Sequence, residues 1–388
     1  MASPKRPKPP RNTARGKVQA HIVSHTHWDR EWYLPFESFR FHLVHLIDKL
    51  LEIFRERPDY RHFVLDGQTI VLDDYLAIRP EKRTEIESLI REGRLVIGPW
   101  YVLPDEFLVS GESIIRNLQL GRRIAADFGP CSQAGYVPDP FGHIAQLPQI
   151  LQGFGLDNFI FLRGMPPARK IGTEFFWQAP DNESTVLALW MKNIYFNASL
   201  LGFDIGWGDP VKQRLDFDME KAIEQLEEQV KDLSEWTHAG AILLNNGCDH
   251  TPPQPHIPDI VTEANRRSKS AVYKHSTFDE FVADVRSSAG NLKTLRGDLR
   301  SSCYIVVLPG VLSARFYLKQ ANRAAERLLA LSVVQSTGPP RAGGGGAGAD
   351  GSWLSHLLAD SGIQGEALTQ VLGRQSDNPR CRNGSLPP

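Results

Sequence analysis

The segment from His25 to Asp29 places imidazole, imidazole and carboxylate at alternate positions, directly after a short apolar run. In extended backbone, side chains two residues apart project on the same side, so His27 and Asp29 can bind one metal ion while His25 supports them from a neighbouring position. Nitrogen and oxygen ligands without a thiolate are typical of zinc, with other divalent cations left open. The spacing therefore predicts a metal site.

Two further carboxylates follow apolar runs. Asp139 lies between two prolines, which restrict the backbone and would hold it in one pose. That rigidity suits a nucleophile, a metal ligand or a tight turn. Asp249 precedes a proline-rich loop, and its neighbour His250 is a metal ligand, a hydrogen-bond partner of Asp249 or a surface residue. For any one such Asp, a helix cap or turn residue is the alternative interpretation.

Short apolar runs alternate with amphipathic segments of helical length, the pattern of β/α units around a mostly parallel sheet. Strands are expected at 20–24, 63–66, 95–98, 134–137, 159–162, 186–190 and 241–245, and helices at 36–57, 82–92, 112–128, 218–233 and 278–288. These elements predict an α/β fold, a seven-stranded, mostly parallel β/α barrel. Asp29, Asp139 and Asp249 each follow an expected strand, where such folds place their binding loops, so the three carboxylates could share one pocket.

The composition excludes several classes of protein. The chain has 388 residues, with 44 Lys plus Arg and 45 Asp plus Glu. Because these charges nearly balance, no strong electrostatic field favours binding to nucleic acid or to a membrane surface. Its apolar runs are far shorter than the roughly 20 residues needed to cross a bilayer. The four cysteines are scattered, which predicts no disulfide framework and a cytoplasmic setting. A homo-oligomer remains open.

The two ends of the chain differ from its middle. Residues 1–19 are basic and rich in proline, and without an apolar signal segment they predict a disordered tail on a chain that is not secreted. Residues 20–309 form the expected barrel domain, and a long helix begins a helical region over 310–333. Residues 334–388 are rich in Gly, Ser and Pro and are expected to be mostly disordered.

The motifs, taken in this order over residues 20–330, resemble glycoside hydrolase family 38, the class II α-mannosidases, and particularly its bacterial-type, non-secreted branch. His27-Trp-Asp29 matches the zinc-binding pair of that family, and Asp139-Pro-Phe-Gly-His143 matches its strand-end nucleophile motif. The resemblance implies that zinc is bound by His27, Asp29 and Asp139, that Asp139 is also the nucleophile, and that Asp249 is the general acid/base. It further implies a substrate-binding set of Trp32, Arg163, Trp100 and Asp105.

The implied reaction is the retaining hydrolysis of α-linked mannosides, which needs two carboxyl groups roughly 5 Å apart. Zinc would bind two sugar hydroxyls as a template and Lewis acid. The family's fourth zinc ligand, a histidine in an H-D motif, has no counterpart after Gly310, and its β-rich C-terminal domains are absent. We therefore expect a truncated or frame-shifted chain with weaker metal binding and reduced activity. The alternatives are a sugar-binding remnant without turnover and another metal-dependent carbohydrate hydrolase, such as a deacetylase.

Overall fold

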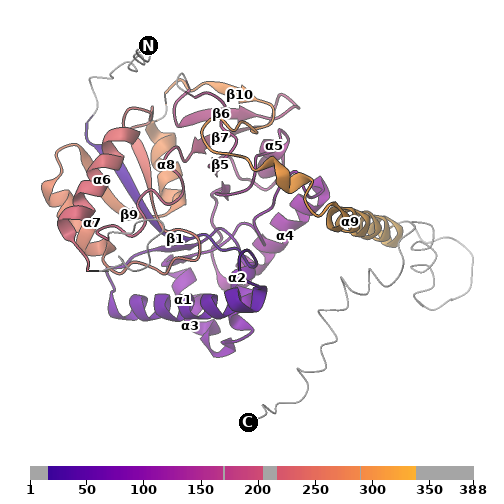
Figure 1. Ribbon diagram of the computed structural model, residues 1–388, viewed down its shortest axis with the longest axis horizontal. Helices are drawn as coiled ribbons and strands as arrows, with labels where there is room; N and C mark the ends of the chain where they lie inside the picture. The colour runs from indigo at the N-terminus through magenta and orange to yellow at the C-terminus, as the bar shows by residue number, and fades with distance from the viewer. Residues whose placement is uncertain (1–15, 169–170, 204–215, 289, 338–388) are drawn as a thin grey trace, which may run out of the picture. The chain divides into compact units, whose positions relative to one another are not determined.

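The computed structural model describes residues 16–168, 171–203, 216–288 and 290–337, which Figure 1 shows as coloured ribbon. Residues up to Ala330 form one compact unit, and a second unit comprises Leu331–Pro388. The expected disordered ends, 1–19 and 334–388, lie largely outside the described residues. The fold that follows is that of the first unit.

Strand β1 (Val18–Thr26) is the centre of the first sheet. It pairs in parallel with β8 (Ala241–Asn246) along one edge, and with β9 (Ala271–Ser276) and then β2 (Phe63–Leu65) along the other. The short strand β3 (Leu95–Val96) continues the sheet from β2, also in parallel. The loops that follow β1, β2 and β8 therefore leave the sheet at the same end.

The second sheet has the order β10-β6-β7-β5-β4. Its strands are β4 (Tyr136–Val137), β5 (Asn158–Phe161), β6 (Glu174–Gln178), β7 (Thr185–Trp190) and β10 (Thr294–Arg296). All neighbours are parallel except β6 and β7, which are antiparallel. The expected seven-stranded barrel is wrong: in the part of the chain that the structure describes, ten strands form two five-stranded sheets and no closed barrel. Strands β6, β9 and β10 were not expected.

The expected helices agree with the structure to within about one residue at each end. They are α1 (Phe36–Glu56), α3 (Arg83–Arg91), α4 (Gly111–Phe128), α6 (Met219–Leu233) and α8 (Phe278–Ser288). Three helices were not expected: α2 (Ile70–Leu76), α5 (Leu147–Gly153) and α7 (Ile257–Arg267). Helix α9 (Phe316–Thr337) begins inside the helical region expected over 310–333. At two turns or fewer, α2 and α5 are too short to show a clear helical period. Within the described ranges, no helix is long and apolar enough to span a membrane.

Neighbouring side chains along a strand pack into different parts of the hydrophobic core. Ile22 of β1 packs into the cluster that includes α1, α6 and α7, whereas its neighbour Val23 packs into a cluster with α8. Strand β5 alternates in the same way, because Ile160 joins the α8 cluster while Phe159 packs with α4 and α5. Successive side chains of a strand point to opposite faces, so one core lies between the two sheets and two more lie outside them. In Figure 1, α6 and α7 flank the first sheet and α4 and α5 lie beside the second.

Helix α4 approaches the loop after β3 very closely at Gly121. A Cβ atom at Gly121 would lie 2.2 Å from the carbonyl carbon of Trp100 and 2.4 Å from the oxygen of Pro99. Both are backbone atoms that cannot turn aside, so we expect Gly121→Ala to lower the free energy of unfolding by about 1–3 kcal/mol. Urea denaturation measures this change. The matched control is Gly153→Ala in α5, where a Cβ meets nothing within 4 Å; similar values for both variants would contradict the close approach.

Candidate functional site

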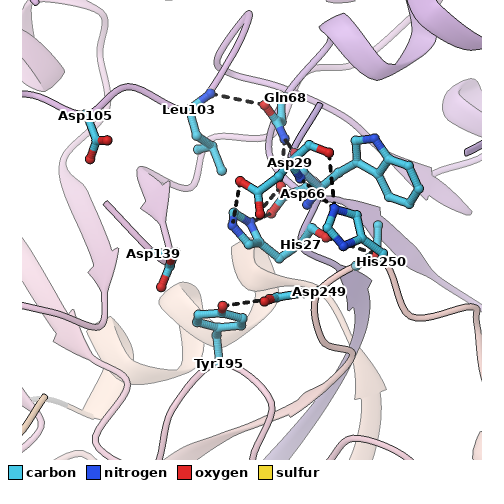
Figure 2. Close-up of polar contacts among 12 residues, drawn as sticks. His27, Asp29, Asp66, Gln68, Leu103, Asp105, Asp139, Tyr195, Asp249 and His250 are labelled. Atoms are coloured by element: carbon cyan, nitrogen blue, oxygen red, sulfur yellow. Dashed lines mark hydrogen bonds and ion pairs between the residues drawn. The ribbon is translucent and has the colours of Figure 1, made fainter. Parts of the chain in front are cut away.

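Loops from both sheets meet at the candidate site. His27 and Asp249 follow the paired strands β1 and β8 and form one further parallel bridge, while Asp139 follows β4 of the second sheet. Figure 2 shows His27, Asp29, Asp139 and Asp249 around one space. Burial is the main cause of the raised pKa of Asp29, and the negative charges of Asp66, Asp249 and Asp139 add to the rise.

His27 is held in one orientation by a buried carboxylate. Its Nδ1 lies 3.0 and 3.2 Å from the two carboxylate oxygens of Asp66, and its Nε2 lies 3.8 Å from Oδ1 of Asp29. Burial lowers the pKa of His27, but the charge and hydrogen bond of Asp66, and then the charges of Asp29 and Asp139, raise it to about 10. A histidine whose Nδ1–H is bound to a carboxylate while its Nε2 stays free has the arrangement of a metal ligand.

Asp66 organises this part of the site and was not singled out from the sequence. It is wholly buried, and its Oδ2 accepts hydrogen bonds from the backbone N of Trp28 and from Nε2 of Gln68, both at 2.7 Å. Gln68 also donates to the oxygen of Trp28 at 2.8 Å and accepts from the N of Leu103 at 3.1 Å. The available signal was its position, because Asp66 directly follows β2 just as the other aspartates follow their strands.

His250 ties the Asp29 loop to the loop after β8. Its Nε2 lies 3.2 Å from the backbone N of Asp29 and 3.1 Å from the oxygen of Asp29. Its ring stacks on Phe39 at 4.2 Å, and its backbone N donates to the oxygen of His27. Of the three alternatives for His250, the hydrogen bond to Asp249 is replaced by bonds to the backbone of Asp29, and the half-buried ring is not a free surface group. The metal-ligand alternative stays a prediction. Burial raises the pKa of Asp29 to about 6, against the opposing charge of His27.

Asp139 is paired with Arg163. Nε and Nη2 of Arg163 donate to Oδ1 of Asp139 at 3.0 and 2.7 Å, and Nη1 donates to the oxygen of Val306 at 2.6 Å. Burial raises the pKa of Asp139, while His27 and Arg163 oppose this rise. Oδ2 of Asp139 has no hydrogen-bond partner among the described residues. Arg163, assigned to the substrate-binding set, therefore contacts the predicted nucleophile, and its contact with substrate stays a prediction.

The loop after β3 holds the Asp139 loop in place. Oδ1 of Asp105 accepts a hydrogen bond from the N of Phe141 at 3.2 Å. Next to it, the buried Glu106 binds Nδ1 of His143 at 2.6 Å and the N of Ile144 at 2.9 Å. Asp105 was expected to contact substrate, and in the structure its carboxylate supports the segment that carries the predicted nucleophile.

The two tryptophans expected to contact substrate differ in exposure. Trp100 is wholly buried, and its Nε1 donates to the oxygen of Tyr136 at 3.1 Å. Because no part of Trp100 is accessible, its expected role as a substrate contact is wrong in this structure. Trp32 has 66% of its surface exposed, so its ring is available to a ligand.

Asp249 has a partner that the sequence did not indicate. The hydroxyl of Tyr195 donates to Oδ1 of Asp249 at 2.7 Å, and Figure 2 shows this contact. The backbone oxygen of Tyr195 in turn accepts from Nε2 of His25 at 2.8 Å. His25 therefore does not support His27 and Asp29 as expected, and its ring supports Tyr195. Burial lowers the pKa of His25.

The residues present provide part of a metal site. Among the described residues, no three or more His, Cys, Asp or Glu side chains are gathered closely enough to hold an ion by themselves. His27 and Asp29 form a nitrogen and oxygen pair whose separation of 3.8 Å suits two ligands of one cation. Asp139 would have to turn from Arg163, or use its free oxygen, to complete the predicted three-residue set.

Comparison with known proteins shows the family of this chain. Residues 17–300 match the N-terminal domain of glycosyl hydrolases family 38, and the chain belongs to this family. It is 37% identical over 328 residues to a protein of Halalkalibacterium halodurans provisionally named a mannosylglycerate hydrolase, a match that covers 81% of this chain and 35% of that protein. It is 24% identical to mouse alpha-mannosidase 2C1, over 80% of this chain and 28% of that protein.

A solved structure supports the same assignment. The crystal structure of an alpha-mannosidase from Enterococcus faecalis has a TM-score of 0.72 and 35% sequence identity, and the match covers 79% of this chain and 34% of that one. The chain thus spans about a third of the length of these two bacterial relatives.

Proposed function

We propose that this chain is a metal-dependent retaining α-mannosidase. One observation carries the proposal: Asp139 and Asp249 each have Oδ1 bound by a neighbouring side chain, whereas Oδ2 has no hydrogen-bond partner among the described residues. A retaining glycosidase needs one carboxylate that attacks and one carboxyl that transfers a proton. Family membership and the mannosidase names of the relatives support this use of the pair.

The two carboxyl groups would act in sequence. Oδ2 of Asp139 forms a bond to the anomeric carbon as the bond from that carbon to the glycosidic oxygen breaks, and the departing oxygen takes the electron pair and a proton from Asp249. In the second step Asp249 takes a proton from water, whose oxygen displaces Asp139 from the sugar. In this structure Arg163 positions Asp139 through its two bonds to Oδ1.

His27, Asp29 and Asp139 would hold the metal, for which zinc is the first candidate. When bound, such an ion supplies a Lewis acid for the hydroxyl groups of the mannose ring. The exposed ring of Trp32 offers an apolar surface to the sugar. Asp66 fixes the tautomer of His27 for this role, because its carboxylate accepts the Nδ1 hydrogen.

Hydrolysis by the full chain tests the proposal. We expect mannose from an aryl α-mannoside, with the α-anomer formed first by NMR, and we expect a chelator to reduce the rate and zinc to restore it. The substrates should include mannosylglycerate, because the Halalkalibacterium relative is named for it. Release of acetate from an acetylated sugar, without mannose, would favour a deacetylase. Sugar binding without turnover would favour a non-catalytic remnant; either result would overturn the proposal.

A further inference from the structure

Tyr195 contacts three parts of the candidate site at once. Its hydroxyl donates to Oδ1 of Asp249 at 2.7 Å, its ring meets the ring of His27 edge-on at 5.4 Å between centroids, and its backbone oxygen accepts from His25 at 2.8 Å. Only 3% of Tyr195 is exposed. A side chain enclosed on so many sides has one available rotamer, so its hydroxyl is a fixed point beside Asp249.

The backbone around Tyr195 is fastened to β8, the strand that leads to Asp249. Oδ1 of Asn197 accepts from the N of Asn245 at 2.7 Å, and the N of Ala198 donates to the oxygen of Asn245 at 3.0 Å. Nδ2 of Asn246 donates to the oxygen of Ala198 at 2.8 Å. The segment that carries Tyr195 and the strand that carries Asp249 are therefore held as one unit.

His25 completes this support from β1. It is 1% exposed, and its Nε2 donates to the oxygen of Tyr195. On the other side, a Cβ atom at Gly247 would lie 2.0 Å from the backbone oxygen of His25, so only glycine allows the loop after β8 to pass so close to β1. His25 therefore contacts both the backbone of Tyr195 and the loop that leads to Asp249.

The contrast between Tyr195 and Asp249 indicates a role. Asp249 is exposed whereas Tyr195 is buried, and an exposed Asp with no partner would sample several rotamers. The bond from Tyr195 restricts this freedom and leaves Oδ2 of Asp249 open. We propose that Tyr195, supported by His25, is a positioning residue that directs Oδ2 of Asp249 toward the glycosidic oxygen. This inference rests on the proposed function, in which Asp249 transfers the proton.

The test is the dependence of a Tyr195→Phe variant on the leaving group. A dinitrophenyl leaving group departs without a proton, whereas the alkoxide of a mannobiose needs one, and general acid catalysis contributes about 10²- to 10⁴-fold. We expect Tyr195→Phe to lower kcat for mannobiose by about 10- to 100-fold, the value of a hydrogen bond to a charged group, and to lower glycosylation of the enzyme by dinitrophenyl α-mannoside by less than about 3-fold. Single-turnover kinetics separates glycosylation from the later steps.

The matched control is Tyr75→Phe. Tyr75 of α2 also donates from a buried ring to an aspartate, Asp48, at 2.6 Å, but it lies outside the candidate site. We expect Tyr75→Phe to change the rates for mannobiose and for dinitrophenyl α-mannoside by the same factor. Equal losses for the two substrates in Tyr195→Phe, at an unchanged thermal midpoint, would overturn the positioning role while leaving the proposed function intact.

A second pair of variants covers the case in which Tyr195→Phe destabilises the fold. His25→Leu removes the donor to the oxygen of Tyr195, and His25→Gln keeps a donor near the position of Nε2. We expect the leaving-group-dependent loss in His25→Leu and its rescue in His25→Gln; the same profile for both would overturn the support from His25. No turnover of either substrate by the unaltered chain, with zinc present, would overturn the proposed function and this inference with it.

Discussion

Asp139→Asn is expected to lower kcat/KM for an aryl α-mannoside on the order of 10⁴-fold or more, because an amide cannot form the bond to the anomeric carbon. The fold should tolerate the change, since Asn keeps an oxygen at the position that accepts from Nε and Nη2 of Arg163. Steady-state hydrolysis measures the loss. Intact-protein mass after incubation with an activated mannoside should show a mannosyl adduct on the unaltered chain and none on the variant.

Glu81→Gln is the control for this prediction. Glu81 is exposed and lies in the short 3₁₀ helix Pro80–Lys82, outside the loops that carry the candidate residues. Its variant should retain full activity. If Asp139→Asn hydrolysed the mannoside at the unaltered rate, or still formed the adduct, Asp139 would not be the nucleophile and the retaining scheme would have to be abandoned.

Asp66→Ala should lower the free energy of unfolding by about 3–5 kcal/mol, because it removes one partner of a buried charged pair. Three donors lose their acceptor together: Nδ1 of His27, the backbone N of Trp28 and Nε2 of Gln68. None of them can find water, since Asp66 and its surroundings are buried. Urea denaturation of the metal-free chain measures the effect without any dependence on activity.

The same Asp66→Ala variant also tests whether Asp66 supports His27 as a metal ligand. Removing the carboxylate behind a metal-binding histidine typically costs 10- to 100-fold in affinity, so zinc binding by calorimetry should weaken by about that factor. Asp127→Ala on the exposed face of α4 is the control, and it should change the stability by no more than about 0.5 kcal/mol. A small stability change in Asp66→Ala, similar to that of the control, would show that the His27 contact is not what holds this loop.

The helices and most strands of the first unit could be predicted because their signals are local. The 3.6-residue period over 36–57 lies within one segment of sequence, and α1 spans Phe36–Glu56. Strand pairing is not local. The residues of Thr185–Trp190 do not indicate that this segment pairs in antiparallel with Glu174–Gln178. The structure has this antiparallel pair, short edge strands such as β4, and two separate sheets where one barrel was expected.

Three of the candidate residues, Asp29, Asp139 and Asp249, could be found from the sequence because each lies within three residues of the end of a strand and in a recognisable motif. Their partners could not. Asp66 reaches His27 across 39 positions of the chain, and Tyr195 reaches Asp249 across 54. Spacing carries no information about contacts at such separations, which depend on the parallel pairing of β1 with β2 and β8.

By itself, the sequence determined the family, the types of side chain that could do chemistry, and the strand ends that carry them, because these are properties of short segments. Only the tertiary structure decided how each side chain is used. It buried Trp100 in the core, turned Asp105 to the loop of Asp139, and placed His25 behind Tyr195. The physical reason is that a hydrogen bond or a buried surface depends on distances of a few ångströms between segments that only the packing of the two sheets brings together.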